Sequence, residues 1–187
     1  MSIKKIVSSF TVTGLVIAIL GGCTAATPVI TERDLDAIKQ QQAIMAIHTL
    51  KSRYLTFMDK GPGGPGPYAD GLIELFSEDA IWEIETNGKV ETYRGKDQIL
   101  KRFKSIEGYF KPYNLRYTKH ITTNPELDVD GKKATGRWQL IMIGQQTDKN
   151  LNFLIGYYDD IYEENTEGEW KIKMSRVVVG CCEITHR

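Results

Sequence analysis

The sequence has no block of basic residues and no excess of either charge. Lysine and arginine together number 24, aspartate and glutamate also number 24, and both signs are mixed along the chain. Proteins that bind nucleic acid contact phosphates through many Lys and Arg side chains gathered on one surface. We therefore expect no nucleic acid among the partners.

Cysteine is scarce as well, with only Cys23, Cys181 and Cys182 in 187 residues. Their spacing does not suggest a metal site, and we expect neither a metal nor a cofactor. A disulfide between the adjacent Cys181 and Cys182 would be strained. An oxidising compartment still allows a labile bridge or a bond between two chains, so their redox state stays open.

No apolar run reaches the roughly 20 residues that a membrane-spanning helix needs. The longest, residues 6–20, has 15 residues, so a permanent transmembrane helix is the weaker interpretation. Lys4 and Lys5 precede this run, and Gly21, Gly22 and Cys23 follow it. A basic segment, an apolar segment and small residues in this order indicate an export signal.

The segment LGGC, residues 20–23, resembles a bacterial lipobox. The resemblance implies that residues 1–22 are a signal peptide and that lipid on Cys23 tethers the chain, with residues 23–29 as a spacer. Thr24 in place of Asp favours the outer membrane, so we expect a lipid-anchored protein of the bacterial cell envelope facing the periplasm. The alternative is an ordinary secretory signal with a free cysteine nearby.

Three helices are expected after the spacer, at residues 31–60, at 68–76 and from Gly95 onward. In the first, a shared helical spacing predicts one buried face made of Leu35, Ile38, Ile47, Leu50, Tyr54 and Met58. The stretch GPGGPGP, residues 61–67, must end this helix because proline lacks a backbone donor and glycine is conformationally free. We expect it to be a loop without ladder pairing.

Strands dominate the second half of the chain. Residues 80–85 and the hairpin signal Asn87-Gly88 come before four long β-rich segments, residues 117–129, 133–146, 151–163 and 169–180. Tight turns between the long segments predict an antiparallel sheet. Helices first and strands later indicate an α+β domain, with three helices covering a curved, cone-shaped antiparallel sheet that has an internal pocket.

The segments FSEDAIWEI, YRGKDQILKRF, KHITTNPELDVDGKKATGRWQL and GYYDDIYEENTEGEWKIKMSR, in this order, resemble the SnoaL-like branch of the nuclear transport factor 2-like superfamily. We place this domain at residues 30–180 and a tail at residues 181–187. The resemblance implies an apolar pocket at the open end of a cone. In relatives this pocket is the active site of dehydratases, cyclases or isomerases, or a plain binding site. A homodimer is a further possibility, because dimers are frequent in the superfamily.

The resemblance also implies a catalytic set. In dehydratases of the superfamily, a Tyr and an Asp from the first helix region face a His on the sheet. Tyr54 and Asp59 keep the Tyr-x4-Asp spacing of one such enzyme, and His120 lies in the matching strand. Those enzymes carry a further acid or histidine on the next strand, whereas residues 142–145 offer none.

Elimination next to a carbonyl, or a double-bond shift, needs a base for a C–H proton and a donor for the developing oxyanion. His120 suits the base, Tyr54 the donor, and Asp59 the group that orients the imidazole. Alternatively, burial makes Asp59 itself the base, as an Asp is in ketosteroid isomerase. Each residue also has a structural interpretation, with Tyr54 in the core and Asp59 as a helix-end acid or a partner of Arg53.

We expect four side chains of the long strands either in the pocket wall, where they would bind substrate, or in the core: Trp138, Met142, Phe153 and Tyr157. Asp160 and Arg176 are expected to form an ion pair between adjacent strands. The resemblance implies a possible function as a cofactor-free lyase or isomerase, dehydratase-like, acting on a small or polycyclic apolar molecule, but the missing further acid leaves this choice open. The alternatives are a lipid-anchored protein that binds such a molecule without converting it, and a cone filled by side chains whose sheet face forms a dimer.

Overall fold

The computed structural model of the chain describes residues 30–61, 64–110, 115–146 and 151–181. The predicted signal peptide, Cys23, the spacer and Cys182 therefore lie outside the described residues. Within these four segments, no helix has both the length and the apolar character needed to span a membrane.

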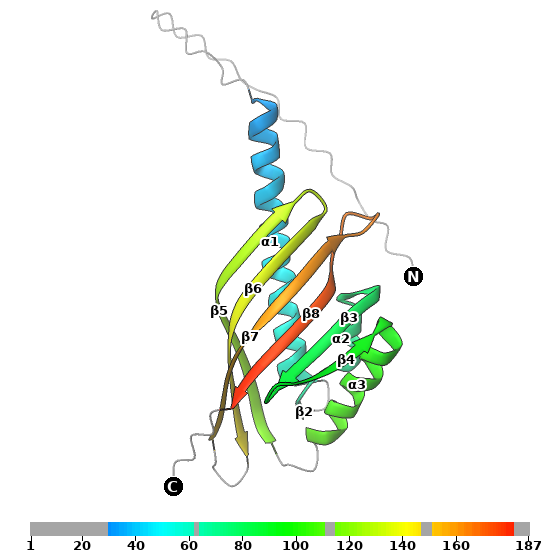
Figure 1. Cartoon of the computed structure of the whole chain (residues 1–187), viewed down its shortest axis with the longest axis vertical. Coiled ribbons are helices and arrows are strands. Elements are labelled where there is room, and N and C mark those ends of the chain that lie inside the picture. Colours follow the sequence, from blue (N-terminus) through cyan, green and yellow to red (C-terminus); the bar gives the residue numbers. More distant parts are fainter. Residues whose placement is uncertain (1–29, 62–63, 111–114, 147–150, 182–187) are drawn as a thin grey trace, which may run out of the picture. The chain divides into compact units, whose positions relative to one another are not determined.

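Three helices and six long strands form one α+β unit (Figure 1). The helices are α1 (Glu32–Asp59), α2 (Ala69–Ile73) and α3 (Gly95–Phe110). The strands are β3 (Phe76–Thr86), β4 (Lys89–Arg94), β5 (Leu115–Asp130), β6 (Lys133–Gln146), β7 (Leu151–Glu164) and β8 (Trp170–Cys181). The predicted order of elements is confirmed.

The Gly- and Pro-rich stretch after α1 ends the helix as predicted, but it is not wholly unpaired. Two-residue strands β1 (Lys60–Gly61) and β2 (Gly64–Pro65) pair with each other. Such a short, isolated ladder tolerates proline because a strand at an edge needs no donor on its outer side.

The six-stranded sheet has the order β4-β3-β8-β7-β6-β5. The β3–β4 hairpin turns through Asn87 (φ 53°) and Gly88 (φ 74°), as the Asn-Gly signal predicted. The prediction of a wholly antiparallel sheet was wrong at one place, because β3 and β8 are parallel. Turn signals report only neighbouring strands, and this pairing joins strands that lie far apart in the sequence.

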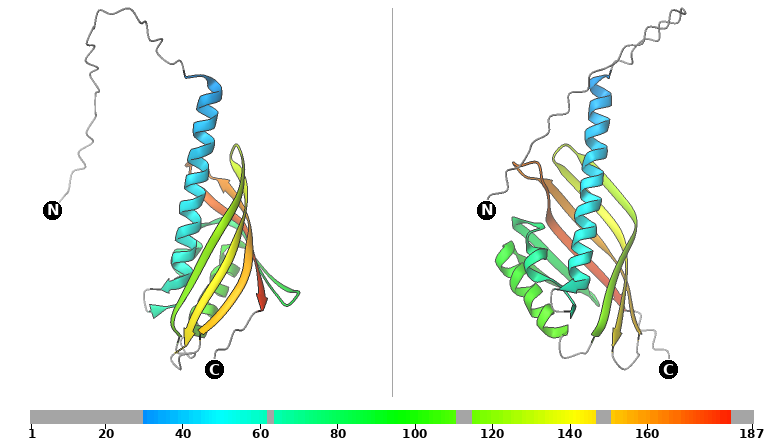
Figure 2. Two further views of the ribbon diagram at one scale, coloured as in Figure 1. Left: turned by 90° about the vertical axis from the view of Figure 1, so that its left-hand side faces the viewer. Right: turned by 180° about the vertical axis from the view of Figure 1, so that it is seen from behind.

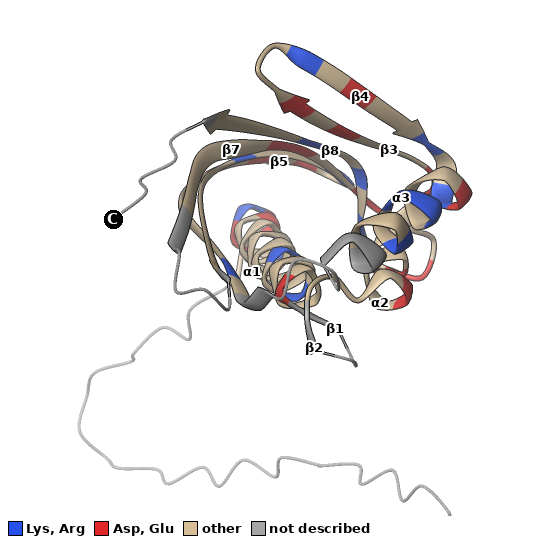
Figure 3. Ribbon diagram, turned by 90° about the horizontal axis from the view of Figure 1, so that it is seen from below, with Lys and Arg blue, Asp and Glu red and all other residues tan. Residues whose placement is uncertain are grey.

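The sheet curves around α1, while α2 and α3 lie beside the β3 and β4 end (Figure 3). Curvature is helped by a bulge in β5 between Thr123 and Glu126, where Asn124 has a φ of 48°. A bulge adds an unpaired residue and bends its strand. The curved, cone-like arrangement places α1 against the concave face.

The core lies between α1, α3 and this concave face. It includes Ile47, Leu50, Phe103, Trp82 and Tyr158, all nearly inaccessible to solvent. The predicted buried stripe of α1 is wrong in its first turns, because these project beyond the sheet (Figure 2). Leu35 and Ile38 are accordingly 46% and 48% exposed.

Candidate functional site

The end of α1 is bound to the middle of β5 through Asp59 and His120. One carboxylate oxygen of Asp59, Oδ1, accepts the backbone N–H of His120 at 2.8 Å and lies 2.6 Å from Nδ1 of its ring. The Thr118 hydroxyl donates to the backbone carbonyl of Asp59 at 3.4 Å. Asp59 and His120 are each only 8% exposed. The helix therefore ends here with its last side chain facing the sheet, and not solvent or Arg53.

This contact selects one form of the imidazole. Because a carboxylate oxygen can only accept, the Nδ1 of His120 carries a proton in this contact, and Nε2 has the lone pair whenever the ring is neutral. The second carboxylate oxygen of Asp59 forms an ion pair with Nζ of Lys119 at 3.3 Å. The backbone N–H and the ring Nδ1 of His120 both contact Oδ1, and these two contacts together orient the ring.

His120 lines a cavity of about 520 Å³ that opens beneath the curved sheet. That volume lies in the range of small-molecule sites. Most of the wall is apolar, formed by Met58, Trp82, Ile84, Ile106, Leu140, Met142, Leu154, Val177 and Val179. The remaining lining residues are Tyr54, His120, Tyr158, Arg102 and Ser105. A few polar groups in an apolar wall are typical of ligand pockets.

Tyr54 lies in the same wall, and its hydroxyl is oriented by a neighbour. Nε1 of Trp82 donates to the Tyr54 oxygen at 3.2 Å. Since that bond uses the oxygen as acceptor, the phenolic proton remains available, and no acceptor for it occurs among the described residues. Burial raises the pKa of Tyr54 well above its ordinary value, so the group stays a protonated donor.

Tyr54 and His120 thus line the same cavity, and Asp59 contacts the imidazole from outside the wall. Met142 lies in the wall as expected, directly across from His120 in the β5–β6 register. No acidic or histidine side chain occupies that neighbouring position. The further acid that the sequence already lacked is therefore also missing at the corresponding place in the fold.

Three residues that we expected in the wall lie elsewhere. Trp138 is buried deeper under α1, where its Nε1 donates to the Tyr162 hydroxyl at 3.0 Å. Phe153 and Tyr157 do not line the cavity, whereas Leu154 and Tyr158 do. Because side chains alternate between the faces of a strand, Phe153 and Tyr157 point to the convex face.

Several wall residues were not predicted from the sequence. For some of them the sequence contains a usable pattern, and for Arg102 it contains none. Trp82 and Ile84 alternate along β3 and Val177 and Val179 along β8, so the period-2 pattern could have placed each pair on one face. Arg102 on α3 has no motif that distinguishes it from an ordinary surface residue. Only the packing of α3 over the sheet brings it to the cavity.

The predicted pair of Asp160 and Arg176 was wrong. Asp160 faces the concave side and binds Nζ of Lys51 at 2.8 Å, while Arg176 contacts Glu85 at 2.5 Å. The register pairs Asp160 with Ser175 and not with Arg176, which sets the two predicted partners on opposite faces. Burial lowers the pKa of the Lys51 ammonium group, and Asp160 opposes this shift.

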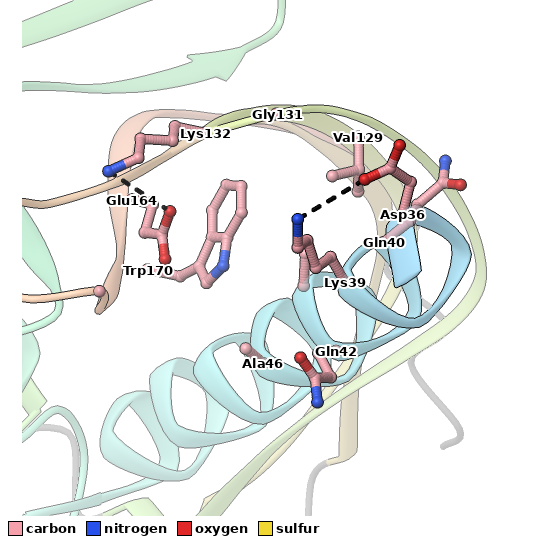
Figure 4. A pocket seen from close by; sticks show the side chains of 12 residues that line it. Asp36, Lys39, Gln40, Gln42, Ala46, Val129, Gly131, Lys132, Glu164 and Trp170 are labelled. Atoms are coloured by element: carbon pink, nitrogen blue, oxygen red, sulfur yellow. Dashed lines mark ion pairs between the residues drawn. The ribbon is translucent and has the colours of Figure 1, made fainter. Parts of the chain in front are cut away.

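A larger hollow of about 670 Å³ lies between the N-terminal half of α1 and the hairpin turns of the sheet (Figure 4). Its charged side chains pair locally, Lys39 with Asp36 at 3.6 Å and Lys132 with Glu164 at 3.9 Å. The Lys39 and Asp36 side chains are 75% and 76% exposed, so this is an open surface groove. The predicted residues Tyr54 and His120 line the smaller cavity instead. In the described part of the chain, no cluster of His, Cys, Asp and Glu could hold a metal ion.

Solved structures of distant relatives share the fold. An NTF2-like protein with a cystatin-like fold from Novosphingobium aromaticivorans has a TM-score of 0.63 at 16% identity, covering 80% of this chain and 90% of its own. A provisional scytalone dehydratase from the same organism has a TM-score of 0.58 at 19% identity, covering 83% and 93%. A variant of a Mycobacterium tuberculosis protein of unknown function reaches 0.61 at 22% identity, covering 78% and 76%.

At these identities the likeness concerns the fold alone. Among curated proteins, none matches the sequence. The model of the SnoaL-like domain, however, matches residues 40–176, which include all three helices in whole or in part, the sheet up to the middle of β8, and the cavity lining except Val177 and Val179. The chain therefore belongs to the SnoaL-like domain family.

Proposed function

We propose that the domain binds a small or polycyclic apolar molecule in the cavity and transfers a proton on it without a cofactor, as a dehydratase-like lyase or an isomerase. The observation that carries this proposal is the imidazole of His120, 2.6 Å from the Asp59 carboxylate, in the wall of an apolar cavity that also contains Tyr54. The fold shared with a provisional scytalone dehydratase adds support.

The proposed reaction begins at a carbon next to a carbonyl group. Nε2 of His120 takes the C–H proton, while the Tyr54 hydroxyl donates a hydrogen bond to the enolate oxygen that forms. Asp59 stabilises the resulting imidazolium through Nδ1. In an elimination, the C–O bond to the leaving hydroxyl then breaks and the imidazolium proton leaves with it as water. In an isomerisation, the same proton returns to another carbon.

His120 is a better base than Asp59 in this geometry. Asp59 is absent from the described cavity wall, its Oδ1 contacts the backbone N–H and the ring Nδ1 of His120, and its Oδ2 faces Lys119. A general base must come within hydrogen-bond reach of the proton that it takes. Asp59 therefore acts on the substrate through the imidazole.

The second candidate is a protein that binds the same class of molecule without converting it. Its supporting observation is the position across from His120, where β6 presents the thioether of Met142 in place of an acid. A site without a second acid has one group fewer to protonate a leaving hydroxyl. The two functions differ in whether the bound molecule changes.

Native mass spectrometry of the mature domain, purified from its own host, tests the first step by revealing a bound small molecule. Turnover of that molecule should fall about a hundredfold or more in His120→Ala, because the general base is removed. His48→Ala, which changes an exposed histidine outside the cavity, serves as the matched control. Unchanged turnover in His120→Ala excludes the base, and binding without any turnover by the wild type supports the second candidate.

A further inference from the structure

The cavity wall contains one permanently charged cation, Arg102 of α3. It is the only lysine or arginine among the described residues that line the cavity. Its side chain is 30% exposed, so the guanidinium lies between solvent and the apolar interior. Neither the proton transfer at His120 nor the oxyanion contact of Tyr54 uses this group.

The guanidinium is weakly satisfied by its neighbours. Nη1 lies 3.4 Å from the Ser105 hydroxyl, and Nη2 lies 3.5 Å from a carboxylate oxygen of Glu91. Its Nε is buried and has no hydrogen-bond partner among the residues that the structure describes. Charge-assisted hydrogen bonds of arginine are normally shorter, at about 2.7–2.9 Å. A guanidinium with five N–H donors and only long contacts can donate to a further acceptor.

Glu91 does not neutralise this cation fully. Its nearer oxygen already accepts the Tyr93 hydroxyl at 2.6 Å, and its side chain is 58% exposed. The guanidinium also packs over the Tyr93 ring, with its central carbon 5.6 Å from the ring centre. This packing orients Arg102 without using its N–H donors, whose contacts to Ser105 and Glu91 are both long. An exposed ion pair at such a distance contributes little.

We propose that Arg102 binds the ligand of the cavity directly and that this ligand is an apolar molecule carrying an oxyanion, of which a carboxylate is the best geometric match. The inference rests on the proposed function of the cavity as a binding site. The planar guanidinium can bind a carboxylate with two parallel hydrogen bonds. The apolar wall around it strengthens such a pair, because the local dielectric is lower than that of water. Arg102 thereby selects anionic molecules over neutral ones of the same shape.

A matched pair of fluorescent probes tests this selection on the mature domain. 1-Anilinonaphthalene-8-sulfonate carries an oxyanion, and N-phenyl-1-naphthylamine is the same molecule without it. Arg102→Met keeps the apolar stem and removes the charge. We expect it to weaken binding of the sulfonate about tenfold or more and to change binding of the neutral probe by less than about twofold.

Three further variants test whether the effect belongs to Arg102 and to the cavity. Arg137→Met removes an exposed arginine outside the cavity and should leave both affinities unchanged. Glu91→Gln removes the competing carboxylate and should strengthen binding of the sulfonate only. Met142→Trp fills the cavity and should weaken binding of both probes.

The outcomes separate the two proposals. If both probes bind in the cavity and Arg102→Met weakens neither, the role of Arg102 is overturned while the binding cavity stands. If the wild type binds neither probe, or if Met142→Trp changes neither affinity, the cavity is not the binding site and both proposals fail.

Discussion

Lys51 and Asp160 form an ion pair that is almost completely buried, with side chains 2% and 0% exposed. The same carboxylate also accepts the hydroxyls of Tyr162 and Ser175, each at 2.6 Å. These bonds hold α1 to β7 and β8 beside Tyr54. A buried pair adds little to stability when intact, but the loss of one partner leaves an uncompensated charge.

We therefore expect Lys51→Met to lower the free energy of unfolding by about 3–5 kcal/mol, as measured by urea denaturation. The double variant with Asp160→Asn should recover much of this loss, because the amide is neutral and its oxygen can still accept a hydroxyl. Strictly additive effects of the two substitutions would contradict a direct interaction between the charges.

Gly156 shows how closely strands β7 and β8 approach each other. A Cβ atom added at this position would overlap the backbone carbonyl of Val178, and a backbone atom cannot rotate away. Gly156→Ala should therefore destabilise the domain by about 1–3 kcal/mol or more, measured by thermal or urea unfolding. Gly131 offers a contrast, since no atom lies within 4 Å of its added Cβ and its φ is 57°. Asparagine tolerates this φ, so Gly131→Asn should lower the free energy of unfolding by less than about 1 kcal/mol. Equal losses of stability at both positions would contradict the steric argument.

Elements that depend on local signals could be predicted from the sequence. Helix α1 stops where glycine and proline begin, and the β3–β4 turn follows from Asn87-Gly88. The face of β7 that meets the cavity could not be predicted, because Phe153 and Tyr157 on one face are as apolar as Leu154 and Tyr158 on the other. Alternation then carries no sign of which set is buried.

The residues of the candidate site also fall into those that the sequence predicts and those that it does not. Tyr54, Asp59 and His120 were predicted because a resemblance supplied their spacing, and the structure places Tyr54 and His120 in one cavity wall with Asp59 in contact with His120. Arg102 was missed because its placement depends on how α3 packs across the sheet. The partner of Asp160 was missed because it comes from α1, 109 positions earlier in the sequence, and no local pattern joins the two.

Buried tyrosines should limit the stability of the whole molecule in alkali. Burial raises the pKa values of Tyr54, Tyr158 and Tyr162 above the ordinary value near 10. The native state therefore keeps protons that the unfolded chain releases, so the stabilisation is fully present below about pH 10 and is lost as the pH rises toward the native pKa values. The free energy of unfolding should fall by about 4 kcal/mol per pH unit above pH 10. Tyrosinate absorbance should reveal ionisation of these groups only on unfolding; three tyrosines titrating in the native protein near pH 10 would contradict their burial.

We propose that lipid on Cys23 holds the mature domain at the bacterial outer membrane. Cys23→Ser should then abolish incorporation of labelled palmitate and release the protein from the membrane fraction, because the substituted residue carries no lipid to anchor the protein. Cys182→Ser is the matched control and should keep both properties. Membrane attachment that persists in Cys23→Ser would contradict the lipid anchor.

The central claim is that Asp59 holds the imidazole of His120 with a proton on Nδ1 and that Nε2 faces an apolar binding cavity. Nitrogen NMR of His120 tests it most directly, with N-phenyl-1-naphthylamine as the cavity probe. We predict a single tautomer with the proton on Nδ1, a change at Nε2 when the probe binds, and loss of the tautomer preference in Asp59→Asn. A ring that samples both tautomers as free histidine does, and that does not respond to the probe, would contradict the claim.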